Sequence, residues 1–158
     1  MLSQSDFKQV VKSTPLISID MVVKDANGKV LLGKRTNKPA QNFWFVPGGR
    51  VLKDESLDDA FTRLLNAELR ISKEMVSAKT LGVYQHFYPD NFSGDEFSTH
   101  YVVLAYEVQL RNIPEALPQE QHSDYRWLTP EQLLADDMVH NHSKWYFQEN
   151  QQADSPFL

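Results

Sequence analysis

The sequence predicts a single mixed α/β domain, in which a few helices pack on a β-sheet. Its 158 residues are enough for one domain with a substantial core, and 41% of them are apolar. Segments with the apolar pattern of β-strands are more numerous than segments with helical periodicity. Neither internal repeats nor low-complexity tracts occur. We therefore expect one domain that covers residues 1–158.

The composition excludes several classes of protein. The net charge is −5 and the Lys and Arg residues are scattered, which argues against nucleic-acid binding. The absence of cysteine excludes disulfides and thiolate zinc sites, and it suits a reducing compartment. The N-terminus lacks the apolar segment of a signal peptide, and no stretch approaches the ~20 apolar residues of a membrane span. We therefore expect a cytoplasmic protein without nucleic-acid or membrane partners.

The N-terminal third predicts one helix followed by strands. Apolar side chains at helical spacing predict a helix over 5–13. Runs rich in β-branched or aromatic residues predict strands over 16–23, 30–35 and 43–46. Asn27-Gly28 predicts a hairpin turn between the first two strands, because both residues tolerate positive φ. Pro47 and the two glycines after it end the aromatic strand.

The remaining chain alternates between helices and strands. Ser56, followed three residues later by an acid, predicts a helix start, and that helix would run to about Arg70. Strands are expected over 81–88, 97–110 and 125–128. Thr129, with proline next and glutamine at the third helical position, predicts another helix. A C-terminal helix is expected over 141–150.

The most informative segment is 49–71, in which a glycine turn leads into an acidic helix. Gly49, Glu55, Arg63 and Glu68 follow one another at intervals of six, eight and five residues. The leucines and the phenylalanine of this helix form an apolar stripe, and Glu68 lies at its edge. A carboxylate there costs free energy unless a cation or hydrogen-bond donors compensate it. Glu68 is therefore a candidate metal ligand, the alternative being a solvated glutamate at the margin of the stripe.

This segment resembles the Nudix box, Gly-x5-Glu-x7-Arg-Glu-U-x-Glu-Glu-x-Gly-U, where U is a bulky apolar residue. Leu64 and Ala67 stand where the box has glutamates, and Arg70 replaces the late glycine. The resemblance implies a Nudix-type α/β/α sandwich with a mixed central β-sheet. It also implies that Glu55 and Arg63 pair to hold a loop against the helix, the alternative being two solvated side chains.

The loss of two carboxylates changes the chemistry that we expect. Nudix enzymes gather glutamates around more than one divalent ion, and the ions generate the hydroxide that attacks phosphorus. With fewer acids, one Mg²⁺ can still screen a diphosphate, but the nucleophile needs a base from elsewhere. A screened diphosphate is a good leaving group from the anomeric carbon of a nucleotide sugar. The candidate bases are the five histidines, His86, His100, His122, His140 and His142.

Further segments resemble the GDP-mannose mannosyl hydrolases, a divergent Nudix branch that cleaves the C1–O bond of the sugar. They are GKRTNKPAQNFWFVPGGR, YQHFYPDNFSG, THYVVLAY and the pair Gln121-His122 before DYRWL. The resemblance implies hydrolysis of GDP-mannose, with GDP-glucose as a second candidate, to GDP and the free hexose with inversion at C1. It also implies one Mg²⁺ per active site, which Mn²⁺ could replace, and a homodimer.

The same resemblance assigns roles to particular residues. The ligands of Mg²⁺ would be the carbonyl of Gly48 and the side chains of Glu68 and Gln121. His122 would deprotonate the attacking water. The charge on the departing GDP would be neutralised by Arg35, Arg50 and Tyr101. Contacts with the substrate would come from Asp6, Asp20 and His86, with Asp6 reaching the partner subunit's site if it reaches one.

Each assignment has a structural alternative, and the function has two rivals. The alternatives are a helix cap for Asp6, a strand-end cation for Arg35, a turn residue for Arg50, a core residue for Tyr101, a satisfied sheet histidine for His86 and a solvated loop histidine for His122. One rival function is a conventional Nudix pyrophosphatase that attacks phosphorus in a nucleoside diphosphate derivative. The other is a non-catalytic module that binds a nucleotide sugar.

Overall fold

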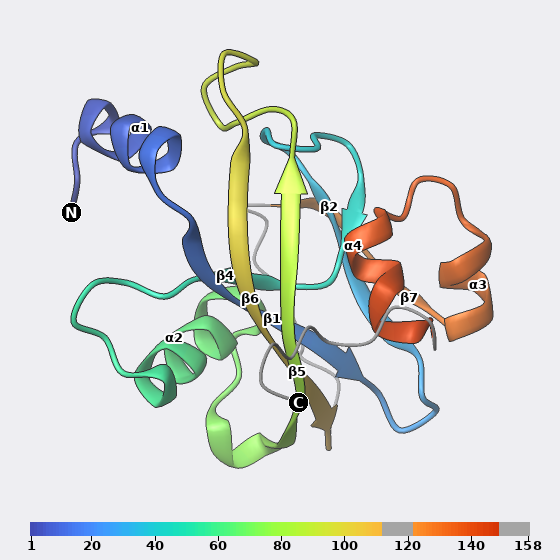
Figure 1. Ribbon diagram of the computed structural model, residues 1–158. Coiled ribbons are helices and arrows are strands. Elements are labelled where there is room, and N and C mark those ends of the chain that lie inside the picture. Colours follow the sequence, from blue (N-terminus) through green and yellow to red (C-terminus); the bar gives the residue numbers. More distant parts are fainter. Residues whose placement is uncertain (112–121, 149–158) are drawn as a thin grey trace.

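The computed structural model describes residues 1–111 and 122–148, and it contains a mixed β-sheet between two groups of helices (Figure 1). The strands are β1 (Leu16–Lys24), β2 (Val30–Arg35), β3 (Trp44–Phe45), β4 (Gly48–Arg50), β5 (Val76–Tyr88), β6 (Thr99–Leu110) and β7 (His122–Leu128). The α-helices are α1 (Gln4–Ser13), α2 (Leu57–Leu69), α3 (Pro130–Ala135) and α4 (Asn141–Lys144). Two short 3₁₀ helices, η1 (Lys73–Met75) and η2 (Trp145–Phe147), complete the described part.

The strands form one sheet in the order β3-β2-β1-β6-β5, with β4 paired to β1 and β7 paired to β2. Among the strand pairs of residues 1–111 and 122–148, β1 and β6 run parallel and the others antiparallel, so the prediction of a mixed central sheet is confirmed. Strand β1 pairs with β2 at Lys24 and Val30, near the end of β1 and the start of β2. Nearer its start, β1 pairs instead with β4, while β2 pairs with β3 and β7. Strands β1 and β2 therefore diverge toward the end of the sheet at which β4 lies.

Each face of the sheet has its own hydrophobic core. On β1, Ile19 and Met21 pack with the apolar stripe of α2. Val22, on the opposite face, packs in a second cluster with residues of β2 and with Leu133 of α3. This alternation follows from the two-residue period of side chains along a strand. It places α2 on one side of the sheet and α3 on the other, as Figure 1 shows.

Helix α2 begins and ends where its local sequence predicts. The Ser56 hydroxyl accepts a hydrogen bond from the Asp59 backbone amide at 3.1 Å, which caps the first turn. The helix ends at Arg70, whose φ of 56° lies in the left-handed region and whose amide donates to Asn66 at 2.8 Å. Glycine adopts this conformation most easily, which explains the glycine of the Nudix box at this position. Arg70 adopts the same left-handed conformation and caps the end of the helix, although it carries a Cβ atom.

Several predicted boundaries were wrong, among them the start of β7, which lies at His122 and not at Tyr125, so that His122 belongs to a strand and not to a loop. The Gly48–Arg50 segment was expected to be a turn, but it forms β4 by pairing with Ser18–Asp20 of β1. Strand β5 starts at Val76, five residues before the predicted start, because residues 77–80 pair with β6 although they are exposed and lack an apolar alternation. The C-terminal helix ends at Lys144 and continues as η2, and the predicted residues 149–150 lie outside the described residues.

Candidate active site

A cavity of about 390 Å³ lies beside β4, where β1 and β2 have parted. It is lined by residues of α1, of six strands, and of the loops that follow β2 and β5. Six of the residues predicted from the sequence line it, namely Asp20, Arg35, Gly48, Arg50, His86 and Tyr101. Residues from distant parts of the chain therefore meet in a single cavity.

The glycines of β4 let this strand approach β1 and α2 closely. A Cβ atom on Gly48 would lie 2.4 Å from the backbone oxygen of Ile19 and 2.7 Å from Asp20 Oδ1. A Cβ atom on Gly49 would lie 2.5 Å from a terminal methyl carbon of Leu64. Neither position has room for a side chain, but the obstacle is backbone at Gly48 and a flexible side chain at Gly49.

This difference gives a prediction for stability. Gly48→Ala is expected to lower the free energy of unfolding by about 1–3 kcal/mol, because the backbone of β1 must move. Gly49→Ala, the matched control, is expected to cost less, because the Leu64 side chain can rotate away. Urea denaturation of both variants measures the two costs. Equal losses in the two variants would contradict the steric argument.

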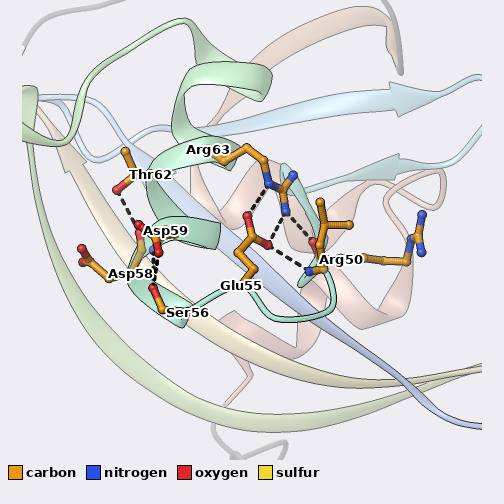
Figure 2. A network of polar contacts seen from close by, with 8 residues as sticks. Arg50, Glu55, Ser56, Asp58, Asp59, Thr62 and Arg63 are labelled. Carbon is orange, nitrogen blue, oxygen red and sulfur yellow. Dashed lines mark hydrogen bonds and ion pairs between the residues drawn. The ribbon is translucent and has the colours of Figure 1, made fainter. Parts of the chain in front are cut away.

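Glu55 and Arg63 form the predicted ion pair. Arg63 Nε donates to Glu55 Oε1 at 2.6 Å, and Arg63 Nη2 donates to Glu55 Oε2 at 2.9 Å and to the Arg50 carbonyl at 2.8 Å (Figure 2). The Leu52 amide also donates to Glu55 at 2.9 Å. The Arg63 guanidinium lowers the pKa of Glu55 to about 2. The prediction that this pair holds the loop against α2 is confirmed, and the alternative of two solvated side chains is wrong.

Glu68 is a buried carboxylate close to the glycine turn. Its side chain is only 4% exposed, so the alternative of a solvated glutamate is wrong. It lies one helical turn after Leu64, the residue whose methyl group contacts Gly49, and on the same face of α2. Its negative charge helps to raise the pKa of the Tyr125 hydroxyl to about 12, after burial, which is the larger cause.

These groups suit a magnesium ion. Mg²⁺ prefers carboxylate and carbonyl oxygens and retains water ligands, so few protein ligands are enough. Glu68 supplies a buried carboxylate but does not line the cavity, whereas Gly48 does line it. The third predicted ligand, Gln121, lies outside the described residues. Within residues 1–111 and 122–148, no three His, Asp or Glu side chains group closely enough to hold a metal ion.

Two arginines bring positive charge to the cavity. Arg35, the last residue of β2, donates from Nη1 to the Pro39 carbonyl at 3.0 Å, and its guanidinium lies 4.9 Å from the Phe45 ring centre. The Arg50 guanidinium lies 4.0 Å from the ring centre of Phe7 on α1. Figure 2 shows the Arg50 side chain directed away from Arg63, which contacts its carbonyl. Both arginines are thus anchored by a carbonyl or a ring while they line the cavity.

Two tyrosines lie near these arginines. Tyr88 and Tyr101 line the cavity, with ring centres 6.3 Å apart in an edge-to-face arrangement. Burial raises the pKa of the Tyr101 hydroxyl, although Arg35 and Arg50 act in the opposite direction. The hydroxyl therefore remains protonated at neutral pH and can donate a hydrogen bond to an anionic group.

Asp20 and His86 are linked through a third residue, Tyr146 of η2. The Tyr146 hydroxyl donates to Asp20 Oδ2 at 2.5 Å and lies 3.4 Å from His86 Nε2. Burial raises the pKa of Asp20 to about 6, while the Tyr146 hydroxyl and Arg35 lower it. Burial also lowers the pKa of His86 to about 3, assisted by the positive charges of His140 and Arg35. His86 is therefore neutral at physiological pH.

The two C-terminal histidines belong to an aromatic cluster. His142 stacks on His86 with ring centres 4.3 Å apart, and His140 stacks on Phe45 at 4.7 Å. Burial lowers the pKa of His140 to about 4 and that of His142 to about 2. Neither ring lines the cavity. The two residues therefore support the site rather than supply a base to it.

The other predicted residues are placed as follows. Asp6 does not line the cavity, and its carboxylate accepts a hydrogen bond from Ser3 at 2.7 Å while its amide donates to the Ser3 hydroxyl. In this chain Asp6 thus takes part in capping α1. His122 is the first residue of β7, and its backbone lies opposite that of Arg35 in the antiparallel pairing with β2. The proposed base and the proposed diphosphate ligand therefore occupy paired positions on neighbouring strands.

Sequence reasoning missed several residues of the site. Phe7, Tyr88 and Phe92 line the cavity, and Phe7 packs against Phe92 with ring centres 4.8 Å apart. Tyr88 could have been inferred, since it follows His86 at the two-residue spacing that points both side chains to one face of a strand. Tyr146 gave no signal, because its contact with Asp20 joins positions 126 residues apart.

The fold and the box helix agree with comparison to known proteins. The sequence matches the NUDIX domain family over residues 14–148. The chain therefore belongs to the Nudix family, whose members are hydrolases that commonly use divalent metal ions.

The relatives of the chain fall into two groups. The low-salt glycan biosynthesis protein Agl8 of Haloferax volcanii is 39% identical over 109 residues, which are 69% of this chain and 68% of that protein. The MutT protein of Methanosarcina mazei has a similar structure, with a TM-score of 0.67, 19% identity and coverage of 85% of this chain and 92% of that one. The NUDIX domain of Shewanella oneidensis NrtR, solved with ADP ribose, gives a TM-score of 0.65 at 19% identity, covering 95% of this chain and 98% of that one. The last two comparisons show the fold alone.

Within the part of the chain that the structure describes, no helix has the length and apolar character needed to cross a membrane.

Proposed function

We propose that the protein hydrolyses a GDP-hexose, with GDP-mannose as the first candidate, to GDP and the free sugar. Water would attack the anomeric carbon, with inversion, and His122 would accept its proton. The observation that carries this proposal is the composition of the cavity. Arg35, Arg50 and Tyr101 line it together with Asp20 and His86, while the box helix beside it has lost two of its glutamates.

The cationic groups suit a diphosphate that leaves. Two guanidinium groups and a protonated tyrosine can donate hydrogen bonds to phosphate oxygens, and these bonds strengthen as negative charge develops on GDP. Phe45 and Phe7 hold the two guanidinium groups from one side, so little reorganisation is needed when the substrate binds. A bound Mg²⁺, held by Gly48, Glu68 and Gln121, would supply further neutralisation of the diphosphate. Mn²⁺ would be expected to replace it.

The polar groups of Asp20 and His86 suit the hexose. A carboxylate and a neutral imidazole are good partners for sugar hydroxyl groups, since between them they accept and donate hydrogen bonds. Burial keeps His86 uncharged, so it adds no repulsion toward the nearby arginines. The relative Agl8 is described as a glycan biosynthesis protein, which agrees with a sugar nucleotide as substrate.

The general base is proposed from its place in the sheet. The backbone of His122 pairs with that of Arg35 across β7 and β2, and Arg35 lines the cavity. His86, His140 and His142 have pKa values of about 3, 4 and 2, so they accept a proton poorly near pH 7. This comparison favours His122 over those three rings. We also propose that the active form is a homodimer.

The position of bond cleavage tests this proposal. Hydrolysis of GDP-mannose with Mg²⁺ in ¹⁸O-labelled water is expected to place the label in mannose, and NMR at early times is expected to show the β-anomer. A parallel reaction in unlabelled water is the control for mass spectrometry. Label in a phosphate product would refute attack at carbon and support a conventional Nudix pyrophosphatase. Tight binding without turnover would support the non-catalytic module.

A further inference from the structure

We propose that Tyr146 is a positioning residue that fixes the Asp20 carboxylate and the His86 ring for contact with the hexose. The inference rests on the proposed function, because it assumes that these two groups contact the sugar. Tyr146 does not line the cavity itself, so it would act only through its two neighbours. Its side chain connects η2 with strands β1 and β5.

The contact with Tyr146 makes the two carboxylate oxygens of Asp20 different, because it engages only Oδ2. Oδ2 accepts the Tyr146 hydroxyl at 2.5 Å. Oδ1 lies toward β4, 2.7 Å from the position that a Cβ atom of Gly48 would occupy. With Oδ2 held, the carboxylate cannot rotate freely, and Oδ1 is left facing the cavity wall that β4 forms. A substrate hydroxyl would therefore meet an oxygen in a fixed position.

The contact with His86 selects one form of the imidazole. A tyrosine hydroxyl has one proton, and the short contact shows that this proton is donated to Asp20. The hydroxyl then presents only a lone pair to His86 Nε2, at 3.4 Å. The neutral ring satisfies this contact when its proton is on Nε2. His86 Nδ1 is then left as the hydrogen-bond acceptor of the ring.

The surrounding packing holds the tyrosine ring without help from its hydroxyl. The ring of Tyr146 meets Tyr84 edge to face at 4.8 Å and packs against two hydrophobic clusters. His86 is held from its other side by stacking on His142, with 15° between the ring planes. Phenylalanine at position 146 would keep these contacts and remove only the polar link. The substitution therefore separates positioning from folding.

Steady-state kinetics test the effect on the sugar. In Tyr146→Phe, kcat/KM for GDP-mannose with Mg²⁺ is expected to fall roughly tenfold, the usual effect of leaving one buried polar partner unsatisfied. The inhibition constant of GDP, which lacks the hexose, is expected to stay within about twofold, since the diphosphate contacts remain. Tyr106→Phe is the matched control, because Tyr106 lies on β6 and packs on Phe61 of α2, outside the cavity. Equal losses for GDP-mannose and GDP, or no loss at all, would refute the inference.

Nitrogen NMR tests the same contact without turnover. In the full chain labelled with ¹⁵N-histidine, the His86 ring is expected to carry its proton on Nε2 at pH 7. Tyr146→Phe is expected to change this proton distribution, and Tyr106→Phe to leave it as in the wild type. In calorimetric titrations, Tyr146→Phe is expected to weaken the affinity for GDP-mannose and to leave the affinity for GDP nearly unchanged. If the wild type does not hydrolyse GDP-mannose, the proposed function fails, while an unchanged His86 signal in Tyr146→Phe refutes the inference itself.

Discussion

Replacing His122 with glutamine is expected to lower kcat for GDP-mannose by about 10²–10⁴, the usual contribution of a general base. Glutamine keeps a polar side chain of similar reach but cannot accept the proton of the attacking water. KM is expected to change little, because the leaving group is bound by other residues. His100→Gln is the matched control, since His100 lies on β6 beside Phe87 and does not line the cavity. A kcat within about threefold of wild type would place the base elsewhere.

The pH profile separates His122 from a second titrating group. The activity of the wild type is expected to rise from about pH 6 to pH 8, because a histidine base must lose its proton before it can accept one from water. Burial raises the pKa of Asp20 to about 6, so this carboxyl titrates in part of the same range. The residual activity of His122→Gln is expected to lack the rise, and Asp20→Asn is expected to keep it. The opposite result would assign the profile to Asp20.

Replacing Glu68 with glutamine is expected to lower kcat by about 10²–10³, because the site would lose charge that holds the metal against the diphosphate. The Mg²⁺ concentration needed for half-maximal rate is expected to rise as well. The Tm is expected to change little, because a neutral amide avoids the desolvation free energy of a buried carboxylate but loses its attraction to Arg63. Loss of activity without loss of stability would therefore indicate a ligand rather than a structural residue.

Glu131→Gln is the control for this substitution, because Glu131 is an exposed acid in the first turn of α3. It is expected to change neither the rate nor the Mg²⁺ dependence. If Glu68→Gln also left both unchanged, Glu68 would have no part in metal binding, and the proposed magnesium site would have to be abandoned.

Local sequence was enough to predict the helices and most strands. The cap at Ser56 and the capping box of Thr129 with Gln132 depend on residues three positions apart, and both form as expected. Strand β4 was missed because its close approach to β1 depends on the absence of a side chain at Gly48, which a turn would also explain. The early start of β5 was missed because residues 77–80 are exposed and lack an apolar alternation, although they pair with β6.

The residues of the candidate site were less predictable from local sequence than the helices and strands. The motif spacing placed Glu55, Arg63 and Glu68 on one loop and one helix, and the structure gives the first two their ion pair and buries the third. The residues on separate strands came from resemblance to known sequences, since no local pattern joins Arg35 to Tyr101. Tyr146 could not be predicted at all, because only the folded chain brings η2 to β1.

The ion pair of Glu55 with Arg63 contributes to the architecture of the box and does not line the cavity. Arg63 fastens the main chain at Arg50 through a hydrogen bond in which the side chains at positions 64 and 67 take no part. The scaffold and the chemistry of the box are thus carried by different amino acids and are free to diverge separately. A lineage could exchange acids on the helix, and with them the bond that is broken, without having to evolve a new way of folding.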